Sequence, residues 1–292
     1  MNTTEYNKKT MYKITEKRHI NKSTVLMKVA APRIAAKARA GQFVILRPTE
    51  TAERIPLTVS GTDAATGEVT VIFQAVGATT SLLASLDAGG FVLDFAGPLG
   101  HPTSLPESGR AAVVGGGLGC AIAYPQAKEL FARGVKTDII AGFRNAEMVI
   151  LEDELRACCD ELTIMTDDGS YGKRGFVTDA LREKLSEKSG RGTIYDIVIA
   201  IGPPAMMKFV SLLTAEYGIK TIVSLNPIMI DGTGMCGGCR VTVDGKIRFA
   251  CVDGPDFDGH KVDFDELIKR GRSYAEEEAH ACRMFGEVDG NA

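Results

Sequence analysis

The chain has 292 residues and a formal net charge of −3, and this length suits about two domains with sizeable hydrophobic cores. Hydrophobic residues make up 45% of the sequence and charged residues 24%, and tryptophan is absent, a composition typical of globular proteins. The slightly acidic balance excludes a general nucleic-acid binder, which needs a basic face to neutralise phosphates.

No uninterrupted apolar run is long enough to cross a bilayer, and the N-terminal segment MNTTEYNKKT lacks the apolar centre of a signal peptide. We therefore expect a cytoplasmic protein with no membrane partner. In that compartment the seven cysteines are expected to be reduced thiols or metal ligands. Four of them have no ligand-like spacing and are interpreted as small apolar side chains, namely Cys120, Cys158, Cys159 and Cys282.

Residues 1–10 are predicted to be a disordered tail, and residues 11–105 have the pattern of an all-β domain. Short runs separated by Gly, Pro and Asp predict a small antiparallel β-barrel. The segment 79–86 begins with Thr and Ser residues that suit a helix N-terminus, so one helix is expected to interrupt the barrel. The predicted strands span 24–30, 41–47, 56–60, 68–76 and 90–96.

Residues 106–225 alternate apolar strands with helical segments. Buried parallel strands read as near-continuous apolar runs because helices cover both faces of the sheet. The alternation predicts a doubly wound α/β domain with a parallel sheet, which binds ligands at the carboxyl ends of its strands. The predicted strands span 110–115, 136–142, 161–166, 194–202 and 219–225, and the helices span 122–133, 152–159 and 204–217.

Residues 226–260 form a third, small module around the segment DGTGMCGGC, which begins at Asp231. Plant-type ferredoxins hold a [2Fe–2S] cluster with the spacing C-x4-C-x2-C and a more distant fourth Cys. Here Cys236, Cys239 and Cys251 keep that spacing, and Asp231 occupies the first ligand position. Glycines let such a loop wrap closely around inorganic sulfide and point N–H groups at it. We therefore predict a [2Fe–2S] cluster held by these four residues.

Two other interpretations of the same cysteines stay open. The Cys-x2-Cys pair together with Cys251 suits a zinc site, and the pair alone suits a redox dithiol. Structural zinc usually takes four soft or imidazole ligands, and no histidine lies in the loop. The nearest histidine, His260, is nine residues beyond Cys251, so the spacing favours the cluster.

The rest of the C-terminal region gives weaker signals. Residues 241–250 have the pattern of a hairpin with an Asp-Gly turn. The tail, residues 261–292, is charged and at most helical. It is a candidate contact for a partner protein.

Glycine-rich or loop-like segments follow three of the predicted parallel strands. Glycines between a strand and the next helix let the backbone approach a pyrophosphate, which the helix N-terminus then stabilises. A tight strand–helix turn is the alternative for the first segment. The candidate residues are Gly115, Gly116, Gly117 and Gly119 after the first strand, Asp168 after the third, and Gly202 and Met206 after the fourth.

The barrel carries a second group of candidate residues in the segments RIPLT and GATT. Arg54 and the hydroxyls of Thr79 and Thr80, which lie near a helix start, would suit a diphosphate. An arginine at a strand edge is commonly only solvated, so the residues alone leave the role of Arg54 open.

The order of these motifs resembles the ferredoxin–NADP+ reductase superfamily over about residues 11–255. R-x-P-L-[ST] is followed by G-x-T, G-P-L-G, the glycine-rich loop, D-D-G-S-x-G and G-P-x-x-M. The cluster module is similar to that of the electron-transfer subunit of dihydroorotate dehydrogenase and its close relatives. Many relatives carry Cys just before G-P-x-x-M, where this chain has Ile201, so no thiol contact to the nicotinamide is expected.

The resemblance implies FAD in the barrel and a nicotinamide nucleotide on the α/β domain. For FAD it implies Arg54, Pro56, Leu57 and Thr58 along the flavin and its phosphates, Phe73 and Gln74 near the ribityl or adenine side, and Gly77, Thr79 and Thr80 at the diphosphate. For the nucleotide it implies Gly115, Gly116, Gly117, Gly119, Asp168, Gly202 and Met206.

Asp231 narrows the resemblance. The dihydroorotate subunit has Cys at this position, whereas one Asp and three Cys resemble the small subunit of the NADH-dependent reduced ferredoxin:NADP+ oxidoreductase, a flavin-based bifurcating enzyme. Sulfide dehydrogenase small subunits look similar. The resemblance implies a larger partner subunit with a second FAD, [4Fe–4S] clusters and sites for NADPH and ferredoxin. A capping role for Asp231, with another group as fourth ligand, is the alternative.

The expected function is therefore that of an oxidoreductase subunit that passes electrons between a [2Fe–2S] cluster, FAD and NAD(H). The alternative of the same class is the electron-transfer subunit of a dihydroorotate dehydrogenase or a sulfide dehydrogenase. The alternative of another class is a non-catalytic, zinc-stabilised binding module. Arg144, just after the second α/β strand, suits the 2′-phosphate of NADP, whereas the resemblance favours NADH, which is the expectation.

Overall fold

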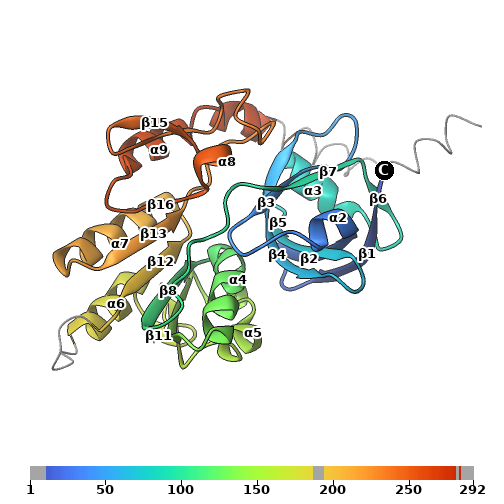
Figure 1. Cartoon of the computed structure of the whole chain (residues 1–292). Helices are drawn as coiled ribbons and strands as arrows, with labels where there is room; N and C mark the ends of the chain where they lie inside the picture. Colours follow the sequence, from blue (N-terminus) through green and yellow to red (C-terminus); the bar gives the residue numbers. More distant parts are fainter. Residues whose placement is uncertain (1–10, 187–193, 281–282, 284–292) are drawn as a thin grey trace, which may run out of the picture.

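The computed structural model describes residues 11–186, 194–280 and 283. The tail predicted over residues 1–10, Cys282 and most of the segment after residue 280 lie outside these described residues. Three parts are visible in Figure 1: a β-barrel, an α/β domain and a small C-terminal module above the α/β domain. This arrangement confirms the predicted fold class.

The first part is a nearly closed antiparallel barrel whose seven strands have the order β6-β1-β2-β5-β4-β3-β7. Branched and aromatic side chains that alternate along these strands fill the interior, among them Val29, Val44 and Phe95, each at most 1% exposed. The strands are β1 (Tyr12–His19), β2 (Thr24–Ala30), β3 (Phe43–Arg47), β4 (Ile55–Asp63), β5 (Glu68–Gln74), β6 (Phe91–Val92) and β7 (Asp94–Leu99), with the helices α2 (Pro32–Ala35) and α3 (Ala78–Ser85).

The second part is a seven-stranded sheet with the order β11-β10-β9-β8-β12-β13-β16. Its first six strands are parallel, and β16 pairs antiparallel with β13 at one edge. The strand order reverses between β8 and β12, which makes this a doubly wound sheet. The strands are β8 (Arg110–Gly116), β9 (Lys136–Phe143), β10 (Glu161–Thr166), β11 (Lys173–Arg174), β12 (Ile197–Ile201), β13 (Lys220–Ser224) and β16 (Asp256–Asp258).

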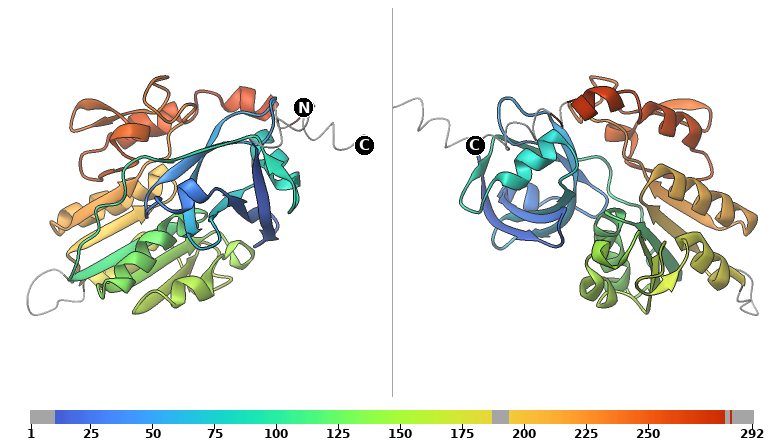
Figure 2. Two further views of the ribbon diagram at one scale, coloured as in Figure 1. Left: turned by 45° about the vertical axis from the view of Figure 1, so that its right-hand side comes forward. Right: turned by 180° about the vertical axis from the view of Figure 1, so that it is seen from behind.

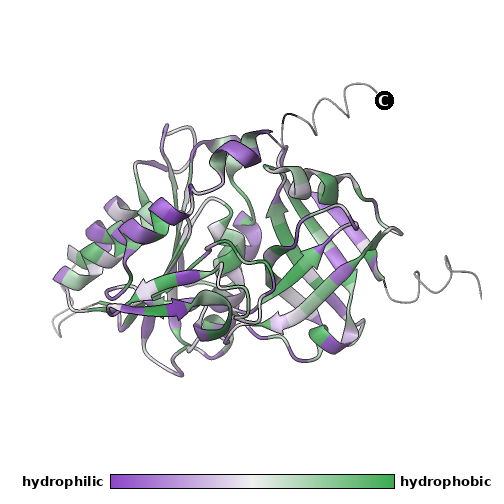
Figure 3. Cartoon of the chain, turned by 90° about the horizontal axis from the view of Figure 1, so that it is seen from above, coloured by the Kyte–Doolittle hydropathy of each residue, from purple (hydrophilic) through white to green (hydrophobic). Residues whose placement is uncertain are grey.

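Helices cover both faces of this sheet (Figures 2 and 3), and the central strands β8, β9 and β12 are mostly apolar and buried. One face packs against α4 (Gly119–Ala132) and α5 (Glu152–Arg156), and the other packs against α6 (Val177–Ser186) and α7 (Pro204–Glu216). A short 3-10 helix, η1 (Ala146–Met148), lies between β9 and α5. Within the described residues, no helix is both long and apolar enough to span a bilayer.

The C-terminal module is inserted between two neighbouring strands of this sheet. The chain leaves at the end of β13, forms the cysteine loop and the hairpin β14 (Arg240–Val243)–β15 (Lys246–Phe249), and returns through α8 (Ala250–Asp253) to β16. Helix α9 (Phe264–Arg270) then packs against α7 and the hairpin. The hairpin is the one predicted, with Asp244 and Gly245 in the left-handed conformation that its turn requires.

Candidate functional site

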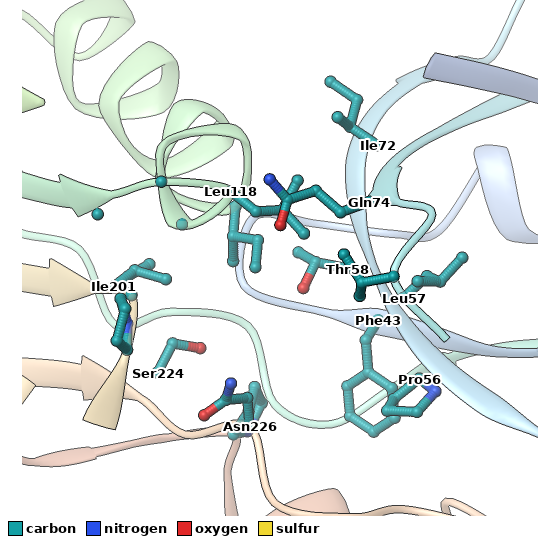
Figure 4. Close-up of a pocket in the computed structure, with 18 of the residues that line it drawn as sticks. Phe43, Pro56, Leu57, Thr58, Ile72, Gln74, Leu118, Ile201, Ser224 and Asn226 are labelled. Atoms are coloured by element: carbon teal, nitrogen blue, oxygen red, sulfur yellow. The ribbon is translucent and has the colours of Figure 1, made fainter. Parts of the chain in front are cut away.

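A cavity of about 570 Å³ lies between the barrel and the α/β domain. Figure 4 shows Thr58 from β4 and Ser224 from the end of β13 facing one another across it. The volume is within the range of small-molecule and cofactor sites, which is about 300–1,000 Å³. The lining residues are Ser23, Phe43, Pro56, Leu57, Thr58, Ile72, Gln74, Val76, Gly116–Gly119, Ile122, Arg144, Met148, Ile201–Pro203, Ser224–Asn226, Met229 and Pro255.

The α/β wall of the cavity is the point where the strand order reverses, between the carboxyl ends of β8 and β12. Ligands of doubly wound sheets bind at such a switch point. The glycines there are required by close packing. A Cβ on Gly119 would collide with the carbonyl oxygen of Ile201, and one on Gly116 would lie 2.5 Å from the sulfur of Met206. Gly117 adopts a positive φ of 56°, which favours glycine.

Four predicted nucleotide residues line the cavity: Gly116, Gly117, Gly119 and Gly202. The other three do not. Gly115 packs against Cys120, and Met206 lies behind Gly116 and Gly202. Asp168 caps its own loop, where its carboxylate accepts the N–H of Ser170 at 2.9 Å and the hydroxyl of Ser170 at 2.7 Å. These two bonds hold the pKa of Asp168 below its usual value.

The barrel wall contains Pro56, Leu57, Thr58 and Gln74 of the predicted FAD residues. Phe73 does not belong to it, because only 1% of Phe73 is exposed and the residue packs in the barrel core. The expected role of Phe73 beside the ribityl or adenine group therefore requires correction. Side chains alternate along β5, so Ile72 and Gln74 face the cavity while Phe73 points inward.

The residues predicted for the diphosphate lie outside the cavity lining. The side chain of Arg54 is 42% exposed, and its guanidinium is paired with Asp94 at 3.3 Å. Thr80 caps α3, because its hydroxyl oxygen accepts the N–H of Gly77 at 2.9 Å. Thr79 accepts the N–H of Glu53 at 3.3 Å. Thr79 and Thr80 therefore lie at the N-terminus of α3, as expected, but their hydroxyls already have partners within the chain.

Sequence reasoning missed several lining residues, including Phe43, Ser224 and Asn226. The only signal for Ser224 and Asn226 is their place at the carboxyl end of the fifth predicted strand. Arg144 is the only charged residue among the described residues that line the cavity. The cavity therefore favours an anionic ligand at that end.

A buried carboxyl lies behind Ser224. Asp256 pairs in register with Ser224 across β13 and β16, and its Oδ2 accepts the hydroxyl of Thr103 at 2.5 Å. Its Oδ1 is buried and has no partner in the structure. Burial raises the pKa of Asp256 to about 6, although hydrogen bonds from Thr103 and Ser224 act in the opposite direction.

The predicted cluster ligands lie in the loop that precedes the hairpin and in α8. The sulfurs of Cys239 and Cys251 are 3.2 Å apart. Backbone N–H groups point at the sulfurs: that of Gly238 lies 3.5 Å from Cys236, and a backbone hydrogen bond from Gly234 reaches Cys251. Such N–H···S contacts are what a cluster loop provides.

As a thiol, Cys251 would keep its proton without a metal. Burial, together with Cys239, raises the pKa of Cys251 to about 12. Metal coordination deprotonates a cysteine ligand outright, so the donor set fits an iron site. Across the described residues, no three His, Cys, Asp or Glu side chains already converge as a metal shell.

Asp231 caps the cysteine loop. One carboxylate oxygen accepts the N–H of Thr233 at 2.6 Å, and the other accepts the N–H of Cys236 at 2.6 Å. Both bonds lower the pKa of Asp231, and the bond from Thr233 has the larger effect. The first oxygen, Oδ1, also accepts the hydroxyl of Thr233 at 3.3 Å, so the lone pair left for iron is on Oδ2.

The cysteine loop is pressed onto the barrel. Gly232 has a φ of +76°, and a Cβ there would lie 2.7 Å from Leu99 and 2.8 Å from Ile45. Ile45 is on the same face of β3 as Phe43, which lines the cavity. The loop and the cavity therefore meet on one strand.

Comparison with known proteins agrees with this geometry. Residues 226–263 match the iron–sulfur cluster binding domain of dihydroorotate dehydrogenase B. A Thermotoga maritima protein named as a homologue of the dihydroorotate dehydrogenase B (NAD(+)) electron transfer subunit is 44% identical over 264 residues, which cover 90% of this chain and 92% of that protein. The named subunit of Bacillus velezensis is 36% identical over 76% of this chain and 86% of its own.

The chain belongs to this family of electron transfer subunits and their homologues. A Clostridium beijerinckii protein of the adh 3′ region is 46% identical and covers 93% of each chain. The family also includes a chain in the structure of the NADH-dependent reduced ferredoxin-NADP oxidoreductase, described for flavin-based electron bifurcation. That chain is 42% identical, with a TM-score of 0.87 over 94% of this chain and 98% of its own. An Amycolatopsis cytochrome P450 reductase, 23% identical with a TM-score of 0.57 over 70% of this chain and 65% of its own, shares the fold alone.

Proposed function

We propose that the chain is an electron-transfer subunit that passes electrons between a [2Fe–2S] cluster in the cysteine loop, FAD on the barrel wall of the cavity and NAD(H) on its α/β wall. One observation carries this proposal. Phe43 lines the cavity while Ile45, on the same face of β3, contacts Gly232 of the cysteine loop. The site of one-electron chemistry and the site of hydride chemistry therefore lie on one strand of the barrel.

A bound flavin would supply the conversion between two-electron hydride transfer and one-electron transfer to a cluster. The chain's own residues would bind and orient it. Pro56, Leu57 and Thr58 form the flavin wall, and Gln74 lies beside them. For the phosphates we propose Arg54, Gly77, Thr79 and Thr80. Thr79 accepts the N–H of Glu53, so the segment just before β4, which includes Arg54, lies beside the N-terminus of α3.

The nicotinamide nucleotide is proposed to bind across the glycine-rich end of β8, with Asp168, Gly202 and Met206 on the neighbouring loops. Ile201 and Gly202 would exclude water from the nicotinamide face, because both line the cavity at the end of β12. Arg144 also lines it, and its charge suits a nucleotide phosphate. We propose NADH as the substrate, as in the name of the structure that is 42% identical.

The partner is proposed to be a larger flavin- and [4Fe–4S]-containing subunit with NADPH and ferredoxin sites, in a cytoplasmic heterodimer. The relative that supports this assignment covers 94% of this chain at 42% identity, and Asp231 in the first ligand position supports it further. The second candidate is the electron-transfer subunit of a dihydroorotate dehydrogenase, supported by the Bacillus velezensis relative at 36% identity.

The test is to purify the chain without oxygen, record its visible spectrum and analyse iron, sulfide and zinc. Flavin peaks with broad cluster absorbance and about two irons and two sulfides per chain are expected. A colourless protein that contains zinc would make the chain a zinc-stabilised binding module instead. Purifying the native complex and identifying its second subunit decides between the two electron-transfer assignments.

A further inference from the structure

A second cavity, of about 610 Å³, lies on the other side of the loop that follows β12. It is enclosed by the N-terminus of α7, the segment after β13, and the end of α9 with the residues that follow it. The lining residues are Pro203, Pro204, Ala205, Asn226, Pro227, Ile228, Ile230, Gly238, Arg240, Leu267, Ile268 and Arg270–Tyr274.

The charge of this cavity is of one sign. Arg240, Arg270 and Arg272 line it, and no aspartate or glutamate is found among its lining residues in the described part of the chain. Over the same residues, none of the three guanidinium groups has a carboxylate within 4.0 Å. Arg270 donates one hydrogen bond, to the carbonyl of Gly238 at 3.3 Å. Because a guanidinium carries five N–H donors, most donors of this group have no partner among the described residues.

The uncharged part of the wall is largely apolar. Pro227, Ile228 and Leu267 form much of it, and the side chain of Ile230 is 52% and that of Tyr274 56% exposed. The first turn of α7, at Pro204 and Ala205, adds the positive end of a 13-residue helix. A ligand that fits has anionic groups for the arginines and an organic body for the apolar wall.

We propose that this cavity binds a phosphate-bearing organic anion, with Arg240, Arg270 and Arg272 as the residues that hold its charge. Phosphate is favoured over a single carboxylate because it carries nearly two charges and three acceptor oxygens, which suits three arginine forks around one space. The volume of about 610 Å³ falls in the small-molecule range of about 300–1,000 Å³, so we favour a free small molecule over the side chains of a docked protein.

The second cavity shares part of its wall with the first cavity. Pro203 and Asn226 line both cavities. A ligand that fills the second cavity therefore lies against Pro203 and Asn226, the two residues that also face the first cavity. The binding claim itself does not depend on the function proposed above, because the arginines belong only to the second cavity.

The test is calorimetric titration of the complete chain, purified with its native cofactors, using phenyl phosphate and inorganic phosphate as probes. We expect phenyl phosphate to bind more tightly than inorganic phosphate, because only the former has an organic body. The double variant Arg240→Gln/Arg272→Gln should weaken both at least tenfold. Arg33→Gln, which removes an exposed arginine of the barrel helix α2, is the matched control and should leave both affinities unchanged.

Three results would overturn the proposal. The first is that the parent chain binds neither phosphate probe. If, in that case, the double variant also fails to co-purify with a partner protein that the parent retains, the arginines serve a protein contact instead. The second is equal weakening in Arg33→Gln, which would indicate nonspecific surface charge. The third is equal affinity for the two probes, which would exclude an organic ligand. Unchanged thermal unfolding and flavin content of the double variant show that its fold is intact.

Discussion

Thr103 donates its hydroxyl hydrogen to Asp256 across 2.5 Å. Thr103 belongs to the segment that joins the barrel to β8, whereas Asp256 begins β16 and lies opposite Ser224 of β13 in register. A Cβ on Gly41 of the barrel would collide with the hydroxyl of Thr103, so the backbone of the barrel closes over this bond. The carboxyl of Asp256 thus lies where the three parts of the molecule meet.

Asp256→Asn is expected to change how stability depends on pH. The pKa of Asp256 is about 6 in the folded chain and about 3.9 when unfolded. Between these values the folded state binds more protons, so the free energy of unfolding of the parent falls as the pH rises from about 4 to about 6. Asparagine removes this loss, and the variant should gain up to about 3 kcal/mol relative to the parent between about pH 4 and pH 7.

Denaturant unfolding of the cofactor-loaded protein at several pH values measures this difference. Asp258→Asn, on the same strand but with a side chain that is 44% exposed, is the control and should show a much smaller change with pH. A difference between Asp256→Asn and the parent that stays constant from pH 4 to pH 7 would contradict the prediction.

Arg54→Ala is expected to weaken FAD binding. Loss of a hydrogen bond to a charged group costs about 1.5–3 kcal/mol, so the dissociation constant should rise roughly tenfold or more, measured by fluorescence titration of the flavin-free protein. Arg47→Ala is the informative control, because Arg47 binds the same carboxylate, Asp94, at 2.8 Å. Equal effects of the two variants would mean that Arg54 acts only through Asp94.

Asp231→Cys is expected to retain a [2Fe–2S] cluster with altered EPR g-values and an altered reduction potential, because a thiolate restores the all-cysteine shell. Asp231→Ala should assemble poorly or recruit a substitute ligand, since it removes both the donor and the caps on Thr233 and Cys236. Spectra and potentials that match the parent in both variants would leave Asp231 as a loop cap only.

Gly232→Ala is expected to lower stability and loosen the cysteine loop. The new Cβ would require a left-handed backbone and would lie 2.7 Å from Leu99 and 2.8 Å from Ile45. Gly245→Ala has a similar φ of +68° but nothing within 4 Å of its Cβ, so it costs only the backbone term of roughly 1–2 kcal/mol. Thermal unfolding should therefore show a larger loss for Gly232→Ala, and equal losses would contradict the close packing.

The sequence predicted the architecture well where periodicity and burial agree. The apolar runs at 110–115 and 136–142 correspond to β8 and β9, which lie in the middle of the sheet with covered faces. The alternation implied a helix between the third and fourth strands, but the bounds of α6 were not predicted, because its exposed face is charged and its apolar residues are not contiguous. The edge strand β16 was missed because three residues, Asp-Phe-Asp, are too short to show a period.

The site was harder to predict because contiguous motif residues divide between two faces of a strand. Phe73 and Gln74 are neighbours in the chain, yet Phe73 packs in the barrel core and Gln74 faces the cavity. Only the register of β5 decides this, and register depends on pairing with strands distant in sequence. The role of Ser224 depends in the same way on where β13 ends relative to the barrel.

The cysteine loop enters from β13 and the chain returns through β16, its neighbour in the sheet. Because adjacent strands hold both ends of this segment, it cannot be removed by simply truncating the C-terminus. A chain shortened at residue 226 would lose β16 as well, leaving the backbone of β13 unpaired at the sheet edge and open to pairing with another molecule. A cysteine loop from a relative should therefore replace only the segment between β13 and β16, with both strands kept. The two strands then hold the ends of each new loop at the same distance from the barrel.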